Sequence, residues 1–482
     1  FRSSQARAFD EYGFFDGLKK VDGEAVSRAA QDITDYLKAY PQGRYAASAR
    51  GLVRRTLWLS GNTSQLSATY ETLLGSVSAS DRGAVDLIQE VDNKLLTDNG
   101  VAQDKGPPQA RGPMILAAMD LIMMRNQGND AEEGGSRSAK ALAAQAPYFA
   151  GQPDLYAFLQ ASQAFHVAKD YRRVLDLIPD DAKKPSYAPL AFSRQVLRGM
   201  ALAALGDRNE TGFWLELANG AKEPYQRPTV ELGLAMALER RGRVSAVFDR
   251  NSAVTDSAIR MILLEQSAGV DLLRQVARDE SRPAVERNMA IATLLFKQLS
   301  RGDYAGFVAS RAITVPAANL PDDDAYANWN RSAIVKNFVS GTWSSGYNCP
   351  ALIDTARTLA RNPRDIPANL CLGEFWRLND FDFSLANAGG EKDKGVLGGV
   401  ANLFPGKTMP RAAIYSAVIA DKAASPGDKA YALYRAVMCY GPSGYNSCGG
   451  DDVEKAQRKG WFMQLKKDYP NSPWAKKLRY YW

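Results

Sequence analysis

Histidine is nearly absent from this chain, since His166 is the only one in 482 residues. Zinc sites and most other transition-metal sites draw on several histidines or on closely spaced cysteines. The four cysteines show no CxxC spacing, and no histidine lies near them in the sequence. We therefore expect no metal site and no cofactor. A histidine-based catalytic triad would have a single candidate.

Long apolar runs are also absent, because no stretch reaches the length of about 18 residues that suggests a membrane span. The nearest approach, residues 113–124 (PMILAAMDLIMM), is shorter and contains Asp120, so it predicts a buried helix. The 60 Lys and Arg residues exceed the 53 Asp and Glu residues by +7. This mild bias predicts no nucleic-acid partner. We interpret the start at Phe1, rather than Met, as a processed or trimmed terminus.

The four cysteines form two local pairs, Cys349 with Cys371 and Cys439 with Cys448. An even count at short spacing, in surroundings rich in Gly, Pro and Asn, is typical of disulfides in an oxidising compartment. A bridge across residues 439–448 (CYGPSGYNSC) would hold an irregular loop, and closing so short a loop stabilises a protein by about 2–3 kcal/mol. The alternative is four reduced thiols buried in a cytosolic protein.

Most of the chain favours helix, and its length exceeds what one hydrophobic core usually serves. Helix-length segments at 155–168, 192–205 and 230–241 end in polar breaks at positions 169, 206 and 242, which are 37 and 36 residues apart. A fourth break, at 302, follows 60 residues later. A period in the mid-thirties is typical of stacked helical hairpins. We predict an all-α solenoid of such repeats; a non-repeating helical bundle is the alternative.

Two further segments, 36–49 (YLKAYPQGRYAASA) and 462–478 (FMQLKKDYPNSPWAKKL), share a second pattern. In each, paired aromatics precede a proline that ends one helix, and small and aromatic residues open the next. Ser472 followed by Pro473 favours such a start. This junction resembles the tetratricopeptide-type repeats of envelope lipoproteins related to the outer-membrane assembly lipoprotein BamD (YfiO) and of TolA-binding repeat proteins. The resemblance implies a periplasmic helical-repeat interaction protein, often held at a membrane by an N-terminal lipid.

Composition divides the chain into four regions. These are N-terminal helical repeats (1–125), helical-hairpin repeats (139–310), helices with long irregular loops (311–410), and C-terminal helices with the cysteine loop (411–482). The boundaries follow Gly-, Pro- and polar-rich stretches. The longest irregular stretch, 388–410, precedes the C-terminal helices, and loops of this length inside a domain are often functional.

Three segments suggest chemistry, and each also has a plainer interpretation. The sequence Gly406-Lys407-Thr408 suggests a phosphate-binding loop, but the required earlier glycine is Ala401, so a flexible surface loop is favoured. Glu374 lies among aromatic residues that would raise the pKa of an acid in a glycan-cleaving enzyme; otherwise it is a solvated or capping residue. His166 precedes a predicted helix end, where a structural role near the last carbonyls is favoured.

Two further motifs that contain aspartate receive structural interpretations. The run Asp322-Asp323-Asp324 lacks the alternating ligands of a calcium loop and predicts the first turn of a helix. The sequence Arg301-Gly302-Asp303 predicts a turn between two repeats rather than an adhesive motif. We therefore predict no catalytic residue in the chain.

The C-terminal segment is unusually dense in aromatic and basic residues. Core packing of a closing helix accounts for most of this density, and exposed members would meet an acidic partner or a membrane surface. The candidate partner-binding residues are Trp461, Lys466, Lys467, Trp474, Lys476, Lys477 and Trp482.

The pattern as a whole predicts a non-catalytic scaffold of the bacterial envelope, periplasmic or associated with the outer membrane. It would bind one or more protein partners through a helical-repeat surface, with possible peripheral membrane association. The alternative function is an envelope glycan-cleaving enzyme, similar to the superhelical lytic transglycosylases, with Glu374 as acid. The signature that follows the catalytic Glu in those enzymes is missing after Glu374.

Overall fold

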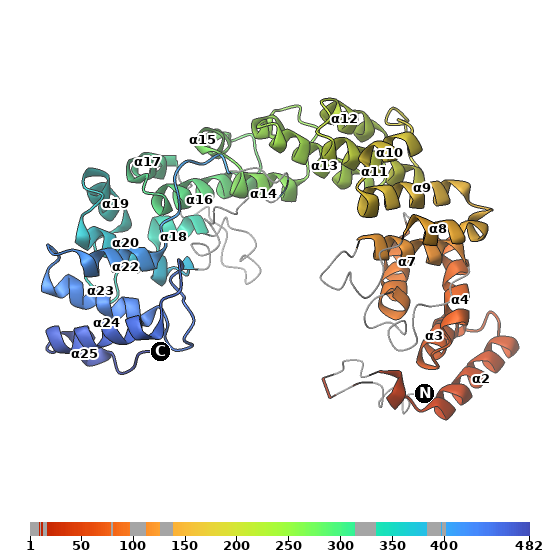
Figure 1. Cartoon of the computed structure of the whole chain (residues 1–482), viewed down its shortest axis with the longest axis horizontal. Helices are drawn as coiled ribbons and strands as arrows, with labels where there is room; N and C mark the ends of the chain where they lie inside the picture. Colours follow the sequence, from red (N-terminus) through yellow and green to blue (C-terminus); the bar gives the residue numbers. More distant parts are fainter. Residues whose placement is uncertain are drawn as a thin grey trace. The chain divides into compact units, whose positions relative to one another are not determined.

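The fold is all-helical, as predicted, in a computed structural model of the chain (Figure 1). The structure describes residues 9, 11–12, 17–78, 81–96, 112–125, 138–313, 334–382, 397 and 402–482, and these residues contain no strand. Contacts divide the chain into two compact units, Phe1–Val230 and Glu231–Trp482, which we describe separately. The four predicted regions stay predictions, and Asp322-Asp323-Asp324 lies outside the described residues.

Helices of the first unit pack mostly against their neighbours in sequence. The elements are η1 (Leu18–Lys20), α2 (Gly23–Ala39), α3 (Ala46–Leu59), α4 (Thr63–Ser76), α5 (Arg82–Val91), η2 (Asp92–Leu96), α7 (Pro113–Arg125), α8 (Ala139–Ala144), η3 (Ala146–Phe149), α9 (Pro153–Gln163), η4 (Ala164–Ala168), α10 (Tyr171–Leu177), α11 (Pro189–Ala204) and α12 (Glu210–Gly220). Helix α2 contacts α3, α3 contacts α4, α4 contacts α7, and the series continues through α9, α10 and α11 to α12. Helix α13 (Gln226–Arg240) crosses into the second unit.

Helix α7 confirms the buried helix that the apolar run at 113–124 predicts. Ile115, Leu116 and Met124 are buried, and Asp120 is also fully buried, with Gln145 donating a hydrogen bond to it over 3.4 Å. Among the described residues, no helix is both long and apolar enough to cross a bilayer.

The second unit continues the pattern of neighbouring contacts. Its elements are η5 (Val244–Phe248), α14 (Ser257–Gln266), α15 (Val270–Arg278), α16 (Ala284–Ser300), α17 (Tyr304–Ser310), η6 (Arg311–Ile313), α18 (Ile334–Ser340), α19 (Leu352–Arg361), α20 (Ile366–Leu378), α22 (Arg411–Ala420), α23 (Pro426–Met438), α24 (Lys455–Asp468) and α25 (Pro473–Lys477). Helix α16 contacts α14, α15, α17 and α18, and it is buried at every position from 288 to 300. From α19, successive contacts lead through α20, α22 and α23 to α24.

The predicted breaks at 206, 242 and 302 are helix ends that share one hydrogen-bond pattern. Each has a glycine with positive φ, at 63°, 68° and 79°. The next N–H donates to the carbonyl five residues earlier: Asp207 to Leu202 (2.9 Å), Arg243 to Leu238 (2.8 Å) and Asp303 to Gln298 (2.8 Å). This is the Schellman motif, which favours glycine because a left-handed backbone costs it little. The predicted interpretation of Arg301-Gly302-Asp303 as a turn is confirmed.

The same device occurs at two positions that the sequence analysis did not single out. Asn62 donates to Leu57 after Gly61, and Phe381 donates to Trp376 after Asp380. The predicted break at Lys169 is a similar turn with a longer hydrogen-bonded loop. The π-helical η4 precedes it, and the N–H of Asp170 donates to the carbonyl of Ala164, six residues earlier instead of five. Asn62, Asp170 and Asp303 then cap the helices that follow.

Glutamates of earlier helices also cap later ones. Glu71 on α4 accepts hydrogen bonds from the N–H groups of Met114 and Ile115 at the start of α7, at 2.8 and 2.9 Å. Glu231 on α13 accepts from Thr255 and Asp256 just before α14, at 2.5 and 2.6 Å. These carboxylates satisfy orphan N–H groups and fix one helix against another.

Both aromatic–proline junctions lie between helices, as predicted. Helix α2 ends at Ala39 and α3 begins at Ala46; α24 ends at Asp468 and α25 begins at Pro473. The predicted cap is confirmed, because Ser472 Oγ accepts from the N–H of Ala475 over 3.1 Å.

Candidate functional site: the C-terminal helices

Glu374 on α20 lies in a buried ionic cluster. Its side chain is fully buried, and both carboxylate oxygens accept from Arg377, at 3.0 and 2.9 Å. Arg435 on α23 reaches one of these oxygens at 3.2 Å, and its own side chain is only 9% exposed. The sequence-based interpretation as a solvated or capping residue is therefore wrong. Burial disfavours the charge of Arg377, but Glu374 outweighs this and raises the pKa of Arg377.

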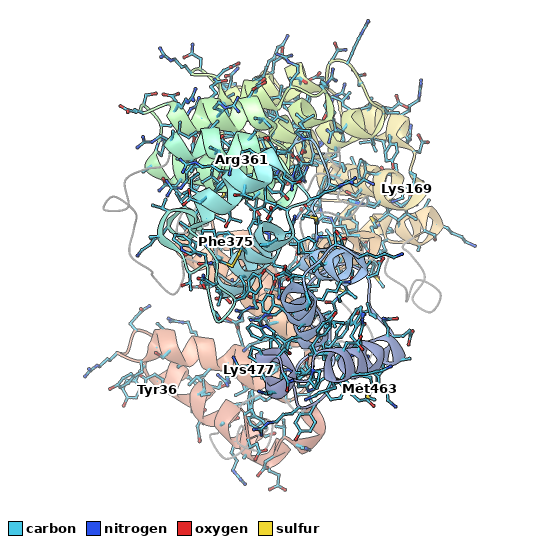
Figure 2. The ribbon with its side chains drawn as sticks, turned by 90° about the vertical axis from the view of Figure 1, so that its left-hand side faces the viewer. Tyr36, Lys169, Arg361, Phe375, Met463 and Lys477 are labelled. Atoms are coloured by element: carbon cyan, nitrogen blue, oxygen red, sulfur yellow. A yellow bond between two sulfur atoms is a disulfide. The ribbon has the colours of Figure 1, made fainter. Side chains whose placement is uncertain are left out.

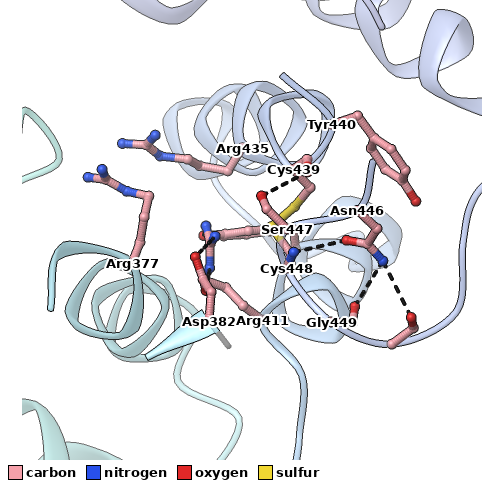
Figure 3. Close-up of a disulfide and its surroundings, with 12 residues drawn as sticks. Arg377, Asp382, Arg411, Arg435, Cys439, Tyr440, Asn446, Ser447, Cys448 and Gly449 are labelled. Carbon is pink, nitrogen blue, oxygen red and sulfur yellow. Dashed lines mark hydrogen bonds and ion pairs between the residues drawn. A yellow bond between two sulfur atoms is a disulfide. The ribbon is translucent and has the colours of Figure 1, made fainter. Parts of the chain in front are cut away.

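A second ion pair, between the buried Arg411 of α22 and the partly exposed Asp382, lies near this cluster. Arg411 donates to Asp382 through two nitrogens, at 2.8 and 2.6 Å (Figure 3). It also donates to the hydroxyl of Tyr415 at 3.0 Å. Burial opposes the charge of Arg411, but Tyr415 and Asp382 outweigh it and raise its pKa. Burial also raises the pKa of Tyr415. The first cluster joins α20 to α23, and the second pair joins α22 to Asp382, which follows the end of α20. Charges buried in this way are costly to separate.

The cluster bears directly on the proposal that Glu374 is a catalytic acid. A general acid must come within hydrogen-bond reach of the oxygen that it protonates. Glu374 is 0% exposed, and two guanidinium groups occupy its oxygens. This geometry favours a structural role for Glu374.

Both predicted cysteine pairs lie at disulfide distance. The sulfur atoms are 2.15 Å apart in Cys349–Cys371 and 2.01 Å apart in Cys439–Cys448. In the second loop, Asn446 accepts from the N–H of Cys448 and donates to the carbonyl of Gly449 (Figure 3). The pair at 439–448 thus fastens an irregular loop at the end of α23.

We expect no thiol of the purified protein to react with an alkylating reagent under denaturing conditions without reductant. The reason is that the described structure contains no free cysteine. After reduction, all four cysteines should be alkylated. Intact mass before and after reduction measures this directly. Alkylation of four thiols without reductant would contradict both pairs and remove the main argument for an oxidising compartment.

The segment around Gly406-Lys407-Thr408 is neither a phosphate-binding loop nor loosely held. Phe404 is buried, and Arg301 Nη1 donates to the carbonyls of Phe404 (2.6 Å) and Gly406 (3.1 Å). Phosphate-binding loops present N–H groups to their ligand, and a helix follows them. Here carbonyl oxygens converge on an arginine, and no helix begins before Arg411. The segment is therefore packed against the end of α16.

His166 lies in η4, three residues before the left-handed Lys169. Its ring meets the edge of Phe165, with centroids 4.9 Å apart. Burial lowers the pKa of His166, and the charges of Arg125 and Lys169 lower it further. The imidazole is therefore disfavoured as a cation beside the helix end, so the helix dipole does not hold it in the charged form.

The predicted partner-binding residues differ in accessibility. Trp474 is buried, with its ring centroid 4.7 Å from that of Tyr431 and 5.3 Å from that of Tyr434. Lys466 is half-buried and donates to the carbonyl of Ala475 over 2.5 Å. Trp461 and Trp482 are half-buried, whereas Lys467, Lys476 and Lys477 are exposed. Core packing thus accounts for Trp474, and the three exposed lysines remain candidates for binding.

One face of α24 is rich in lysine. Ala456, Gly460, Met463 and Lys467 recur at helical spacing, and all four are exposed. Lys455 and Lys459 are exposed beside them. Figure 2 labels Met463 on α24 and Lys477 on α25. We call Lys455, Ala456, Lys459, Gly460, Met463 and Lys467 the lysine face of α24.

Sequence reasoning missed Arg377, Arg411 and Arg435, and it missed Lys455 and Lys459. The spacing of three between Glu374 and Arg377 was a visible signal for a pair on one helix. Arg435 lies 61 positions after Glu374, so only the fold joins them. A local count of charge along α24 would have revealed the lysines.

Comparisons with known proteins identify no relative. No protein-family model matches the chain, no similar curated protein was found, and no solved structure matches the fold.

Proposed function

We propose that this chain is a non-catalytic helical-repeat scaffold of the bacterial envelope that binds a protein partner. The observation that carries the proposal is one recurring turn: at 61, 206 and 302 a left-handed residue joins two contacting helices, and the N–H after it donates to the carbonyl five residues earlier. The same turn ends helices at 242 and 380. Repeated turns of one geometry between contacting helices are what stacked hairpins require. The cysteine pairs support a periplasmic or outer-membrane-associated location.

Helix α5 offers a surface for such a partner. Val85 is 57% exposed and Ile88 is 51% exposed, and a spacing of three places them on one helix face. Burying an aliphatic side chain contributes about 1.5–3 kcal/mol. A protein that covers both residues would therefore gain substantially from this contact.

The test compares recovery of a partner from a detergent-solubilised envelope by the wild type and by the double variant Val85→Asp, Ile88→Asp. We expect recovery of a stoichiometric partner to fall about tenfold or more in the variant. The matched control is Gln89→Asp, an exposed change on the same helix that leaves both aliphatic side chains intact. Equal recovery by all three proteins, or no stoichiometric partner of the wild type, would contradict the proposal.

The enzyme alternative has its own test. We expect the wild type and Glu374→Gln to show the same background rate on cell-wall glycan, because Glu374 is enclosed by arginines. Release of soluble fragments measures this rate. Glycan cleavage that the wild type performs and a folded Glu374→Gln variant has lost would replace the scaffold by a glycan-cleaving enzyme.

A further inference from the structure

Charge is distributed very unevenly along this chain. Residues 455–482 contain eight Lys and Arg residues and one acid, Asp468, so they carry a net +7. The whole chain also carries +7, which means that residues 1–454 hold 52 charges of each sign. The basic character of the protein therefore resides entirely in α24, α25 and the residues that follow them.

These cations lie on adjoining surfaces. The lysine face of α24 contains no acid, because Asp468 lies on the opposite side, at helical spacing from Leu465 and Trp461. Lys466 contacts the carbonyl of Ala475 in α25, and Lys459 lies 6.0 Å from the ring centroid of Tyr481. The basic surface thus continues from α24 to Lys476 and Lys477, which are exposed.

We propose that the lysine face of α24, together with Lys476 and Lys477, docks this protein on the surface of an anionic phospholipid bilayer. Clusters of lysine bind acidic headgroups through additive electrostatic attraction, which needs no fixed geometry. Ala456 and Gly460, which lie among these lysines, have minimal side chains and are exposed, so no bulky group covers this part of the face. Met463 is 55% exposed among them and is positioned to enter the headgroup layer.

The composition of the face favours lipid over the other anionic partners. The cores of protein interfaces are depleted in Lys and enriched in Arg and aromatic residues, whereas every cation of this face is a lysine. Single-stranded nucleic acid binds to exposed aromatic platforms. Here Trp474 is buried and Tyr481 and Trp482 are half-buried, so Tyr480 alone is well exposed among the aromatics of α25 and the residues after it.

The experiment is vesicle flotation with the full chain. The probes are vesicles of phosphatidylcholine alone and vesicles of phosphatidylcholine with phosphatidylglycerol. We expect binding to the anionic vesicles only, weakening steeply as salt is raised. Neutralising five exposed lysines should reduce the partition coefficient by about a thousandfold or more at low salt. The substitutions are Lys455→Gln, Lys459→Gln, Lys467→Gln, Lys476→Gln and Lys477→Gln.

The matched control neutralises five exposed cations of the first unit. These are Lys38, Lys140, Arg172, Arg208 and Lys222, each replaced by Gln. Both variants lose the same net charge, so we expect the control to retain most of the vesicle binding. Equal losses in the two variants would show that net charge alone acts, and would overturn the assignment to α24 and α25.

Two further outcomes would also overturn it. Equal binding to both kinds of vesicle would mean that headgroup charge is not recognised. Tighter binding to polyglutamate or to single-stranded DNA than to anionic vesicles, at the same salt, would assign the face to an acidic protein or to nucleic acid. This inference rests on the proposed envelope function. The two proposals can be contradicted independently, because partner recovery tests Val85 and Ile88 of α5, whereas vesicle binding tests the lysines of α24 and α25.

A dye at position 463 tests the contact itself. We expect an environment-sensitive fluorophore on Met463→Cys to shift to the blue on anionic vesicles, and the same dye on Ser257→Cys, at the start of α14, to stay unchanged. Absence of a shift at 463 despite vesicle binding would place the contact elsewhere on the molecule.

Discussion

Replacing Glu374 with alanine is expected to lower the free energy of unfolding of the second unit by about 3–5 kcal/mol. The reason is the charge that would remain: Arg435 is 9% exposed and Arg377 is 24% exposed, and both lose their shared carboxylate. Removing one partner of a buried ion pair costs far more than the pair contributes, because the other charge stays desolvated. Urea denaturation followed by far-UV circular dichroism measures the change.

The matched control is Asp354→Ala. Asp354 pairs with Arg357 on α19 at the same spacing of three, but both side chains are more than half exposed. Exposed pairs contribute roughly 0–1 kcal/mol, so this variant should unfold close to the wild type. If Glu374→Ala and Asp354→Ala lose equal stability, then the buried cluster does not stabilise the unit.

Local chemistry explains what the sequence could predict. Glycine at 206, 242 and 302 indicates a left-handed helix end wherever it follows a helical pattern, because the preference belongs to the residue itself. The cysteine pairs are separated by 22 and 9 positions, so short spacing suggested them. The turn at Gly61 carries the same signal, and a search for Gly followed by Asn or Asp would have included it.

Interactions between distant segments explain what the sequence could not predict. Whether Glu374 is solvated or buried depends on the position of Arg435. The packing of α20 against α23 sets that position, and the sequence does not show it. The segment at 404–408 is held by Arg301, more than a hundred positions earlier. Aromatic density at the C-terminus fits both a core and a binding surface. For Trp474, only its packing on Tyr431 and Tyr434 shows that the residue belongs to the core.

Replacing Trp474 with alanine is expected to cost about 3–5 kcal/mol of unfolding free energy, because a large buried side chain leaves a cavity. The ring is 8% exposed and packs on Tyr431 and Tyr434 of α23. As a control, Met463→Ala changes a side chain that is 55% exposed and should stay within about 0.5 kcal/mol of the wild type. Thermal unfolding monitored by circular dichroism compares the three proteins.

Comparing Trp474→Phe with Trp474→Ala separates the core role of Trp474 from a role in binding. Helix α25 has only five residues, so packing of Trp474 on α23 must hold it in place, together with Lys476 and Lys477. Trp474→Phe retains a ring and should retain vesicle binding, whereas Trp474→Ala should lose stability first and binding as a consequence. A Trp474→Ala protein as stable as the wild type that had lost only its partner or its vesicles would instead make Trp474 a direct binding residue.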